Sequence, residues 1–107
     1  MKKTLLFVLA AMPAISAVAS PCATGEVTAV VRVDTVGAIN LERFREIDFK
    51  STDSMTQAVN SHVARAIAGG SVACRKANSF FDYASLVSLP GQPIDLWVED
   101  RALEKAD

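Results

Sequence analysis

His62 is the only histidine in this chain of 107 residues. It falls on the apolar stripe of a predicted helix, where a histidine is most often half-buried with one ring nitrogen bonded to a backbone carbonyl. A catalytic or metal-binding role needs a second ligand or a nucleophile, and the sequence has neither H-x-x-x-H nor H-E-x-x-H spacing. We therefore name His62 only as a candidate for a pocket between this helix and a sheet.

Cys22 and Cys74 are the only two cysteines. An even number of cysteines in an exported chain predicts a disulfide, and for a loop of this length the chain-entropy model gives a stabilisation of about 4 kcal/mol. The spacing does not match the C-x-x-C redox motif, and two cysteines with one distant histidine make a poor zinc site. The sequence therefore predicts one structural disulfide, with no metal and no cofactor.

Glu46 and Asp48 are two positions apart, so on a strand their carboxylates point to the same side. Paired carboxylates are the groups that glycoside hydrolysis needs, but basic and acidic residues alternate between Arg43 and Lys50, a pattern typical of a solvated face. The sequence contains no glycine-rich phosphate loop, nucleophile elbow or metal-ligand cluster. We therefore predict that the protein is not an enzyme.

The first 19 residues have the pattern of a signal peptide. A short basic region, 1–3, precedes an apolar run, 5–11, and Ala17-Val18-Ala19 forms a small-x-small cleavage site. The run is shorter than the ~20 apolar residues that span a bilayer, so we expect no membrane span after cleavage. Pro21 stands where a lipoprotein signal has a small residue, which argues against lipidation of the cysteine that follows. The predicted location is periplasmic or secreted.

The part of the chain after the predicted signal, residues 20–107, is long enough for one small domain and no second one. The signal contains two of the 11 basic residues and none of the 12 acidic ones, which leaves 9 against 12, a net charge of −3. Binding to nucleic acid or to an anionic membrane normally uses a basic surface. The charge therefore predicts no nucleic-acid partner.

One amphipathic helix is predicted over residues 54–68. Its stripe residues recur at the 3.6-residue spacing that places them on one face: Met55, Val59, His62, Val63, Ala66 and Ile67. Asp53 or Ser54 can cap the first turn, and Gly69-Gly70 can take the left-handed conformation that ends a helix. We expect this helix to pack its apolar face on a sheet.

Alternation of apolar and polar residues predicts strands in other segments. Residues 26–34 form the first strand, with every second side chain apolar, and residues 35–40 form a connection. Residues 72–77 suit a strand that returns the second cysteine toward the first strand. Residues 86–98 are predicted to form a hairpin around a Pro-Gly turn.

Two segments fit either a helix or a strand. In residues 41–50, an apolar side chain at every third position after Asn40 suggests a capped helical turn, but we favour a strand in the second half. In residues 80–89, the aromatic and β-branched content favours a strand over a helix. The charged tail, 101–107, is predicted to fray or to form one helical turn.

Together these elements predict a single α+β domain. An antiparallel sheet of four or five strands carries the 54–68 helix on one face, and the Cys22–Cys74 disulfide fastens the first strand to the segment after the helix. A small exported domain without a catalytic constellation most often works by binding. We therefore predict a protein that binds a protein partner in the cell envelope or outside the cell, as an inhibitor, an immunity-like protein or an accessory envelope component.

The predicted contact surface is the outer face of the sheet. Trp97 falls on the outward side of the strand at 94–100, and Val30 and Arg32 lie beside it if the first and last strands are neighbours. Trp and Arg are among the residues that most often dominate interfaces. These three residues are therefore the partner-binding candidates.

Three alternatives stay open at this point. The tail or residues 41–49 can cover Trp97 and remove it from the surface. A small ligand can bind, or be hydrolysed, in a pocket at His62. The 80–89 strand can form an unprotected sheet edge through which copies of the protein associate.

Overall fold

The structure is a computed structural model, and it describes residues 22–106. The predicted signal peptide, residues 1–19, lies outside the described residues and stays a prediction. In chain order the elements are β1 (Val27–Val31), β2 (Thr35–Ala38), α1 (Leu41–Glu46), α2 (Thr52–Asn60), β3 (Ala64–Ile67), β4 (Val72–Ser79), β5 (Ala84–Ser88), β6 (Leu96–Glu99), a 3-10 helix (Asp100–Ala102) and β7 (Leu103–Lys105). No helix within residues 22–106 is long and apolar enough to cross a membrane.

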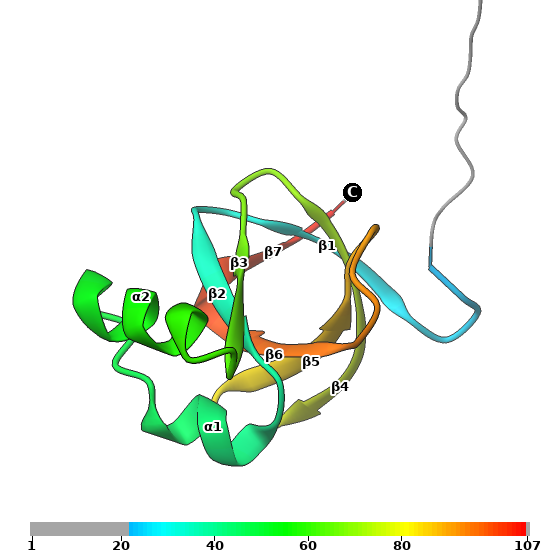
Figure 1. The fold of residues 1–107 in the computed structure, drawn as a ribbon. Helices are drawn as coiled ribbons and strands as arrows, with labels where there is room; N and C mark the ends of the chain where they lie inside the picture. The colour runs from blue at the N-terminus through cyan, green and yellow to red at the C-terminus, as the bar shows by residue number, and fades with distance from the viewer. Residues whose placement is uncertain (1–21, 107) are drawn as a thin grey trace, which may run out of the picture.

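The strands form one seven-stranded antiparallel sheet in the order β3-β2-β6-β5-β4-β1-β7. The sheet curls strongly, so that its strands surround one interior (Figure 1). The α+β class and the antiparallel sheet are confirmed, but the expected four or five strands are too few. Strands β2, β3 and β7 were missed because each is only three or four residues long and lacks a clear alternation of apolar and polar residues.

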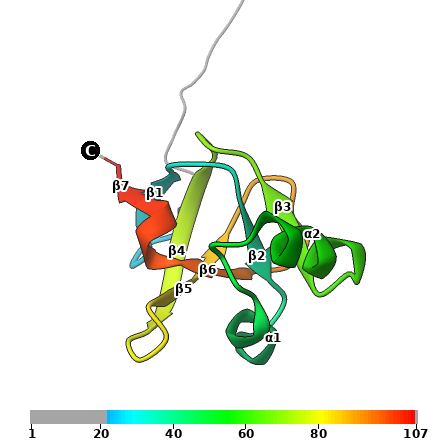
Figure 2. The same ribbon diagram turned by 90° about the vertical axis from the view of Figure 1, so that its left-hand side faces the viewer.

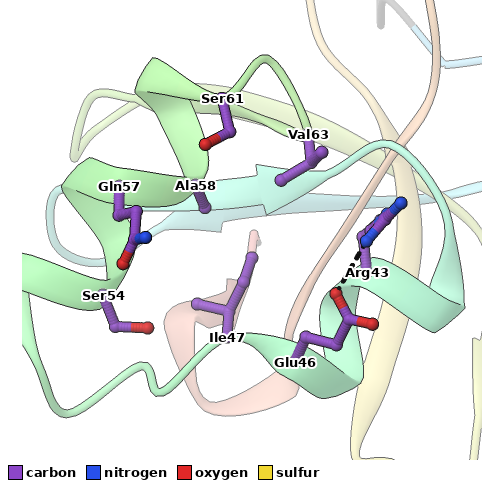
Figure 3. Close-up of a pocket in the computed structure, with 8 residues that line it drawn as sticks. All are labelled: Arg43, Glu46, Ile47, Ser54, Gln57, Ala58, Ser61 and Val63. Carbon is purple, nitrogen blue, oxygen red and sulfur yellow. Dashed lines mark hydrogen bonds and ion pairs between the residues drawn. The ribbon is translucent and has the colours of Figure 1, made fainter.

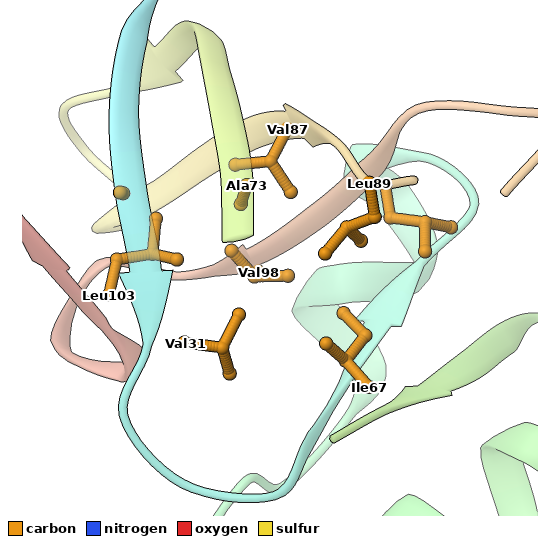
Figure 4. Close-up of a cluster of buried hydrophobic side chains, with 9 residues drawn as sticks. Val31, Ile67, Ala73, Val87, Leu89, Val98 and Leu103 are labelled. Carbon is orange, nitrogen blue, oxygen red and sulfur yellow. The ribbon is translucent and has the colours of Figure 1, made fainter. Parts of the chain in front are cut away.

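The main core lies inside this curl (Figure 4). Its buried side chains come from β1, β3, β4, β5, β6, β7 and the residue after β5: Ala29, Val31, Ile67, Ala73, Val87, Leu89, Leu96, Val98 and Leu103. Val31 on β1 and Ile67 on β3 belong to this one cluster, although four strands separate β1 from β3 in the sheet. The curl therefore brings distant strands of the sheet against a common interior.

Gly37 allows β2 to lie close to its neighbours. A Cβ atom at this position would lie 2.7 Å from Leu96 Cβ and 3.0 Å from Ile67 Cδ1, both of which are core atoms. Only glycine permits so close an approach of the backbone. The β2 strand therefore contributes backbone rather than a side chain to the main core at this point.

Helices α1 and α2 lie outside the curl, on the side of β2, β3 and β6 (Figures 1 and 2). Two smaller clusters of buried side chains lie beneath them: Val36, Ala58 and Ala64 under α2, and Ala38, Phe44 and Ala84 under α1. Phe49, in the segment between the two helices, packs against both clusters, and its ring centroid lies 4.9 Å from that of Phe44. The helices are thus joined to the sheet through one continuous apolar layer.

The helix predicted over residues 54–68 is correct only in its first half. Helix α2 is capped by Ser51, whose hydroxyl oxygen accepts a hydrogen bond from the Ser54 N–H at 3.1 Å, and it ends at Asn60. Residues 64–67 form β3 instead, paired with β2. The prediction of a continuous helix is wrong because pairing with β2 outweighs the local helical spacing.

A Schellman motif ends α2. The N–H of Val63 donates to the carbonyl of Ala58 at 3.1 Å, and the N–H of His62 donates to that of Val59 at 3.0 Å. His62 has φ = 64°, the left-handed conformation that this motif places after the helix. The helix therefore ends at Asn60, eight positions before the predicted end at residue 68.

Residues 41–46 form α1, and residues 47–50, where a strand was favoured, form a turn instead. The side-chain oxygen of Asn40 caps the helix by accepting a hydrogen bond from the Arg43 N–H at 2.8 Å, and Phe44 is buried beneath it. The helical interpretation of this segment is correct, and the favoured strand is wrong. The expected connection at 35–40 is wrong as well, because most of it forms the buried strand β2.

The predicted disulfide is confirmed. Cys22 and Cys74 are bonded with an S–S distance of 2.03 Å. Thr28 on β1 lies opposite Cys74 in the pairing with β4, and its hydroxyl donates to Cys22 Sγ at 3.3 Å. The disulfide therefore ties the segment before β1 to the strand beside β1.

The β4–β5–β6 meander contains two of the predicted elements. The strand predicted at 72–77 is β4, and the hairpin predicted at 86–98 is formed by β5 and β6. The strand predicted over 80–89 is correct only from β5 onward. Ser79 pairs with Ala84, which makes residues 80–83 the loop between β4 and β5.

Candidate functional site

The β4–β5 loop carries three exposed aromatic side chains. Phe80, Phe81 and Tyr83 are 76%, 92% and 71% exposed, and we refer to these three residues as the aromatic tip. The rings of Phe80 and Phe81 contact each other edge to face, with centroids 6.0 Å apart. The loop projects beyond the end of the sheet, where it is yellow in Figure 2. Large apolar groups on a protruding loop offer contact area that the domain itself does not use.

Asp82, the one loop residue that is not aromatic, points back to the protein and anchors the loop. Its carboxylate accepts two hydrogen bonds from Arg45 of α1, from Nε at 2.9 Å and from Nη2 at 3.1 Å. The hydroxyl of Ser79 donates to the same carboxylate at 2.6 Å. The Arg45 guanidinium, with help from the Ser79 hydroxyl, lowers the pKa of Asp82 from 3.8 to about 2. The aromatic tip is thus fastened to helix α1 by an ionised carboxylate.

Tyr83 has an unfavourable backbone conformation. Its φ of 52° lies in the left-handed region, which bulky side chains rarely adopt and glycine adopts freely. Its carbonyl accepts a hydrogen bond from the Asp100 N–H at 2.8 Å, which holds the loop to the end of β6. A non-glycine residue in this region costs on the order of 1 kcal/mol, and such residues concentrate at functional sites. The left-handed residue closes the hairpin loop where it enters β5, and it leaves the tyrosine ring exposed.

The structure places Trp97 next to the base of the aromatic tip. Its side chain is half-buried and packs against the cluster of Ala38, Phe44 and Ala84 beneath α1. Ala84 directly follows Tyr83, so the two regions are continuous along the chain. Part of the Trp97 side chain is therefore covered by the cluster beneath α1.

Val30 and Arg32 lie apart from Trp97. Strands β5 and β4 stand between β6 and β1, so the first and last of the predicted strands are not neighbours. Val30 is paired with Val72 on β4, and Arg32 donates a hydrogen bond from Nη1 to the carbonyl of Arg101 at 3.1 Å. The structure therefore does not bring the three partner-binding candidates into one cluster.

His62 lies on the surface. It is exposed at the end of α2, and it is not among the residues that line the cavity between the two helices. Glu46 and Asp48 also have separate partners, since Glu46 forms an ion pair with Arg43 at 2.9 Å and Asp48 accepts the Lys50 N–H at 3.0 Å. The structure gives neither the histidine nor the two carboxylates a shared site.

The cavity between α1 and α2 has a volume of about 270 Å³ (Figure 3). It is lined by Arg43, Glu46, Ile47, Ser54, Gln57, Ala58, Ser61 and Val63. Its charged groups neutralise each other in the Arg43–Glu46 ion pair, and the Ser54 hydroxyl oxygen accepts a hydrogen bond from the Asp48 N–H at 2.9 Å. The two charged side chains of the lining are thus paired with each other, and the lining shows no nucleophile bonded to a base.

Sequence reasoning missed the aromatic tip. The available signal was three aromatic residues within four positions, directly after the turn-forming pair Asn78-Ser79, but the same residues also favour a strand. Comparison with family models, with curated proteins and with solved structures finds no match for this chain. The candidate function therefore follows from the geometry of this loop.

Proposed function

We propose that the protein is an exported binding protein and that the aromatic tip is its principal contact with a partner protein. The observation that carries the proposal is Tyr83, an exposed aromatic residue kept in a left-handed conformation beside two exposed phenylalanines. Aromatic side chains are enriched in the centres of protein interfaces, where they bury large areas. Leaving three of them in water stabilises nothing in the isolated domain.

The anchoring of the loop supports this proposal. The bonds from Arg45 and Ser79 to Asp82, together with the bond from Asp100 to Tyr83, fix the loop at three points. A contact loop that is already ordered loses less conformational entropy on binding than a flexible one does. The tip is therefore suited to insertion into a pocket of a partner without rearrangement.

The compartment and the class of partner follow the sequence-based expectation. A disulfide persists in oxidising surroundings, which supports a periplasmic or secreted location. The partner is an envelope or extracellular protein that this domain inhibits, neutralises or accompanies. Trp97 extends the contact surface at the base of the tip, whereas Val30 and Arg32 belong to a second region on β1 and just after it.

Site-specific photo-crosslinking tests the proposal. A benzophenone amino acid replaces Phe81 in the exported protein, and a matched protein carries it at Val33, an exposed apolar residue outside the tip. We expect irradiation of whole cells to join one partner protein to position 81 and not to position 33. Equal adducts at both positions, or none at position 81, would contradict the proposal. An adduct with a second copy of this chain would replace it by self-association.

A further inference from the structure

A cavity of about 370 Å³ lies between helix α2 and the sheet, and its lining shares no residue with the cavity of Figure 3 or with the aromatic tip. One wall is a single face of α2, whose lining residues recur at the helical spacing from Thr52 to Asn60. The opposite wall is the beginning of β2 and Ala66 of β3. Sites for small molecules usually measure about 300 to 1,000 Å³, so this cavity can hold a small ligand.

The walls of this cavity are mainly apolar. Val36 is 5% exposed, and Met55 and Val59 of α2 pack against the buried cluster to which it belongs. Thr35 is only 9% exposed, and its hydroxyl forms no hydrogen bond with another of residues 22–106. An apolar chain would therefore be covered on several sides here, next to a hydroxyl that a polar ligand group can use.

The charge in the lining has one sign. Among the described residues, Asp34 is the one charged residue that lines the cavity. Its Oδ1 accepts a hydrogen bond from the neutral Gly69 N–H at 2.8 Å, and it forms an ion pair with no side chain of residues 22–106. Two nearby arginines do not line the cavity. Arg32 donates to a carbonyl of the 3-10 helix at 3.1 Å, and Arg65 is on the opposite face of β3 from the residue that lines the cavity.

We propose that this cavity binds a small molecule in which an alkyl chain ends in a primary ammonium group. The chain lies against Val36, Met55 and Val59, and the ammonium pairs with the Asp34 carboxylate. An anionic ligand would meet the like charge of this carboxylate, and a neutral apolar ligand would leave it without a counter-charge. The site is separate from the aromatic tip, so the inference goes beyond the proposed function and does not depend on it.

The two parts of the ligand contribute by different amounts. Asp34 is exposed, and an ion pair at an exposed site changes affinity by about threefold, because water screens the charges. Each methylene group that leaves water for the apolar walls contributes about fourfold. Affinity should therefore depend more steeply on the length of the chain than on the charge at its end.

Four probes test this combination by NMR titration of the mature, oxidised protein at pH 7. They are n-hexylammonium, the neutral 1-hexanol, the anionic hexanoate and the shorter n-butylammonium. We expect n-hexylammonium to shift the backbone amide signals of residues 34–36, 55–60 and 66 and to bind about threefold more tightly than 1-hexanol. Hexanoate should bind more weakly than the alcohol, and n-butylammonium roughly tenfold more weakly than n-hexylammonium.

Two variants that each remove one negative charge give the control. Asp34→Asn keeps a side-chain oxygen that can accept the Gly69 N–H, so it should lower the affinity for n-hexylammonium to that for 1-hexanol without disturbing the turn. Glu104→Gln removes the same charge from β7, outside the lining, and should retain the difference. Equal affinity of the ammonium and the alcohol for the unmodified protein, or a preference that survives in Asp34→Asn, would overturn the inference, as would shifts confined to other residues.

A fifth probe separates a small molecule from a side chain of a protein. Nα-acetyl-lysine N-methylamide carries an ammonium group on a four-carbon stem, with peptide groups at the other end. We expect it to bind more weakly than n-hexylammonium, because its peptide groups do not match the apolar walls. Tighter binding of the lysine derivative would overturn the assignment to a small molecule. None of these outcomes affects the crosslinking at position 81, which tests the aromatic tip by itself.

Discussion

Arg45 and Asp82 are 37 positions apart in the sequence, and they form a two-pronged ion pair that joins helix α1 to the β4–β5 loop. The Asp82 side chain is 17% exposed and that of Arg45 is 59% exposed, so the pair sits at the edge of the protein with the carboxylate turned inward. Planar, two-pronged pairs fix orientation better than a single contact does. The ion pair therefore helps to hold the loop that carries the three aromatic rings of the tip.

Removing this ion pair should loosen the loop without unfolding the domain. We expect Arg45→Ala to speed hydrogen exchange of the amides of residues 80–83 and to reduce crosslinking at position 81, while the melting temperature changes little because exposed ion pairs contribute little to stability. Arg43→Ala is the matched control, because its ion pair with Glu46 lies within α1. Equal exchange at residues 80–83 in both variants would show that the loop does not depend on Arg45.

The ionisation of Asp82 makes the stability of the folded protein depend on pH under acidic conditions. Its pKa in the folded protein is about 2, below the ordinary 3.8, because Arg45 and Ser79 bind the charged form. The contribution of the ionised Asp82 carboxylate to the free energy of unfolding is therefore fully present above pH 4 and is lost as the pH falls from about 4 to about 2. An NMR titration of the Asp82 carboxyl carbon should show a midpoint near 2, which moves back toward the ordinary value in Arg45→Ala. An unchanged midpoint in the variant would show that Arg45 is not the cause.

Tyr83→Gly should raise the stability of the domain and weaken its binding to the partner. Glycine adopts φ = 52° without strain, so we expect the variant to be more stable toward urea by about 1 kcal/mol. Loss of the ring should at the same time reduce crosslinking to the partner at position 81. Phe80→Gly, at a position outside the left-handed region, should reduce the same crosslinking without gaining stability. Retained crosslinking in Tyr83→Gly would assign the ring no part in binding.

His62→Gly tests the Schellman motif at the end of α2. Since His62 has φ = 64° and an exposed side chain, we expect glycine to raise the free energy of unfolding by about 1 kcal/mol. Ser61→Gly, one position earlier, should lower it, because Ser61 has φ = −87° and glycine adds only flexibility there. Urea unfolding of the two variants checks both signs. A loss of stability in His62→Gly would reveal a contact of the imidazole that the backbone argument omits.

Gly37→Ala tests the close packing of β2. The added methyl group would lie 2.7 Å from Leu96 Cβ, so the strand or the core must shift. We expect a loss of about 1 to 3 kcal/mol in urea unfolding, the usual cost of overpacking a core. Gly70→Ala is a weaker control, since a Cβ atom there has free space and only the left-handed φ of 90° opposes it. Equal or greater stability of Gly37→Ala would mean that β2 has room to move outward.

The features that could be predicted from the sequence are those with a local cause. The alternation in residues 27–31, the capping side chain of Asn40 and the pair of cysteines each leave a signal that does not depend on distant parts of the chain. Strand β3 has no such signal, because its residues continue the helical spacing of α2 and become a strand only by pairing with β2. Long-range pairing of short strands is therefore what local patterns cannot reveal.

The candidate site could not be predicted from the sequence for a related reason. Aromatic residues at 80–83 favour a strand in isolation, and only the register between Ser79 and Ala84 shows that they form a loop. Trp97 was predicted on the outer side of its strand, but the apolar layer with α1 and Phe49, against which it packs, depends on the fold of a distant segment. Exposure is a property of the assembled domain, so the sequence alone could not assign it.

Strand β1 is bordered by β4 on one side and by β7 on the other, and Ala29 is paired with Lys105. During synthesis β1 emerges early, but its second neighbour is made only after residues 103–105 have left the ribosome. The core side chain Leu103 arrives with that neighbour, so the interior stays open until then. Because this closure depends on contacts between distant parts of the chain, we expect it to slow folding.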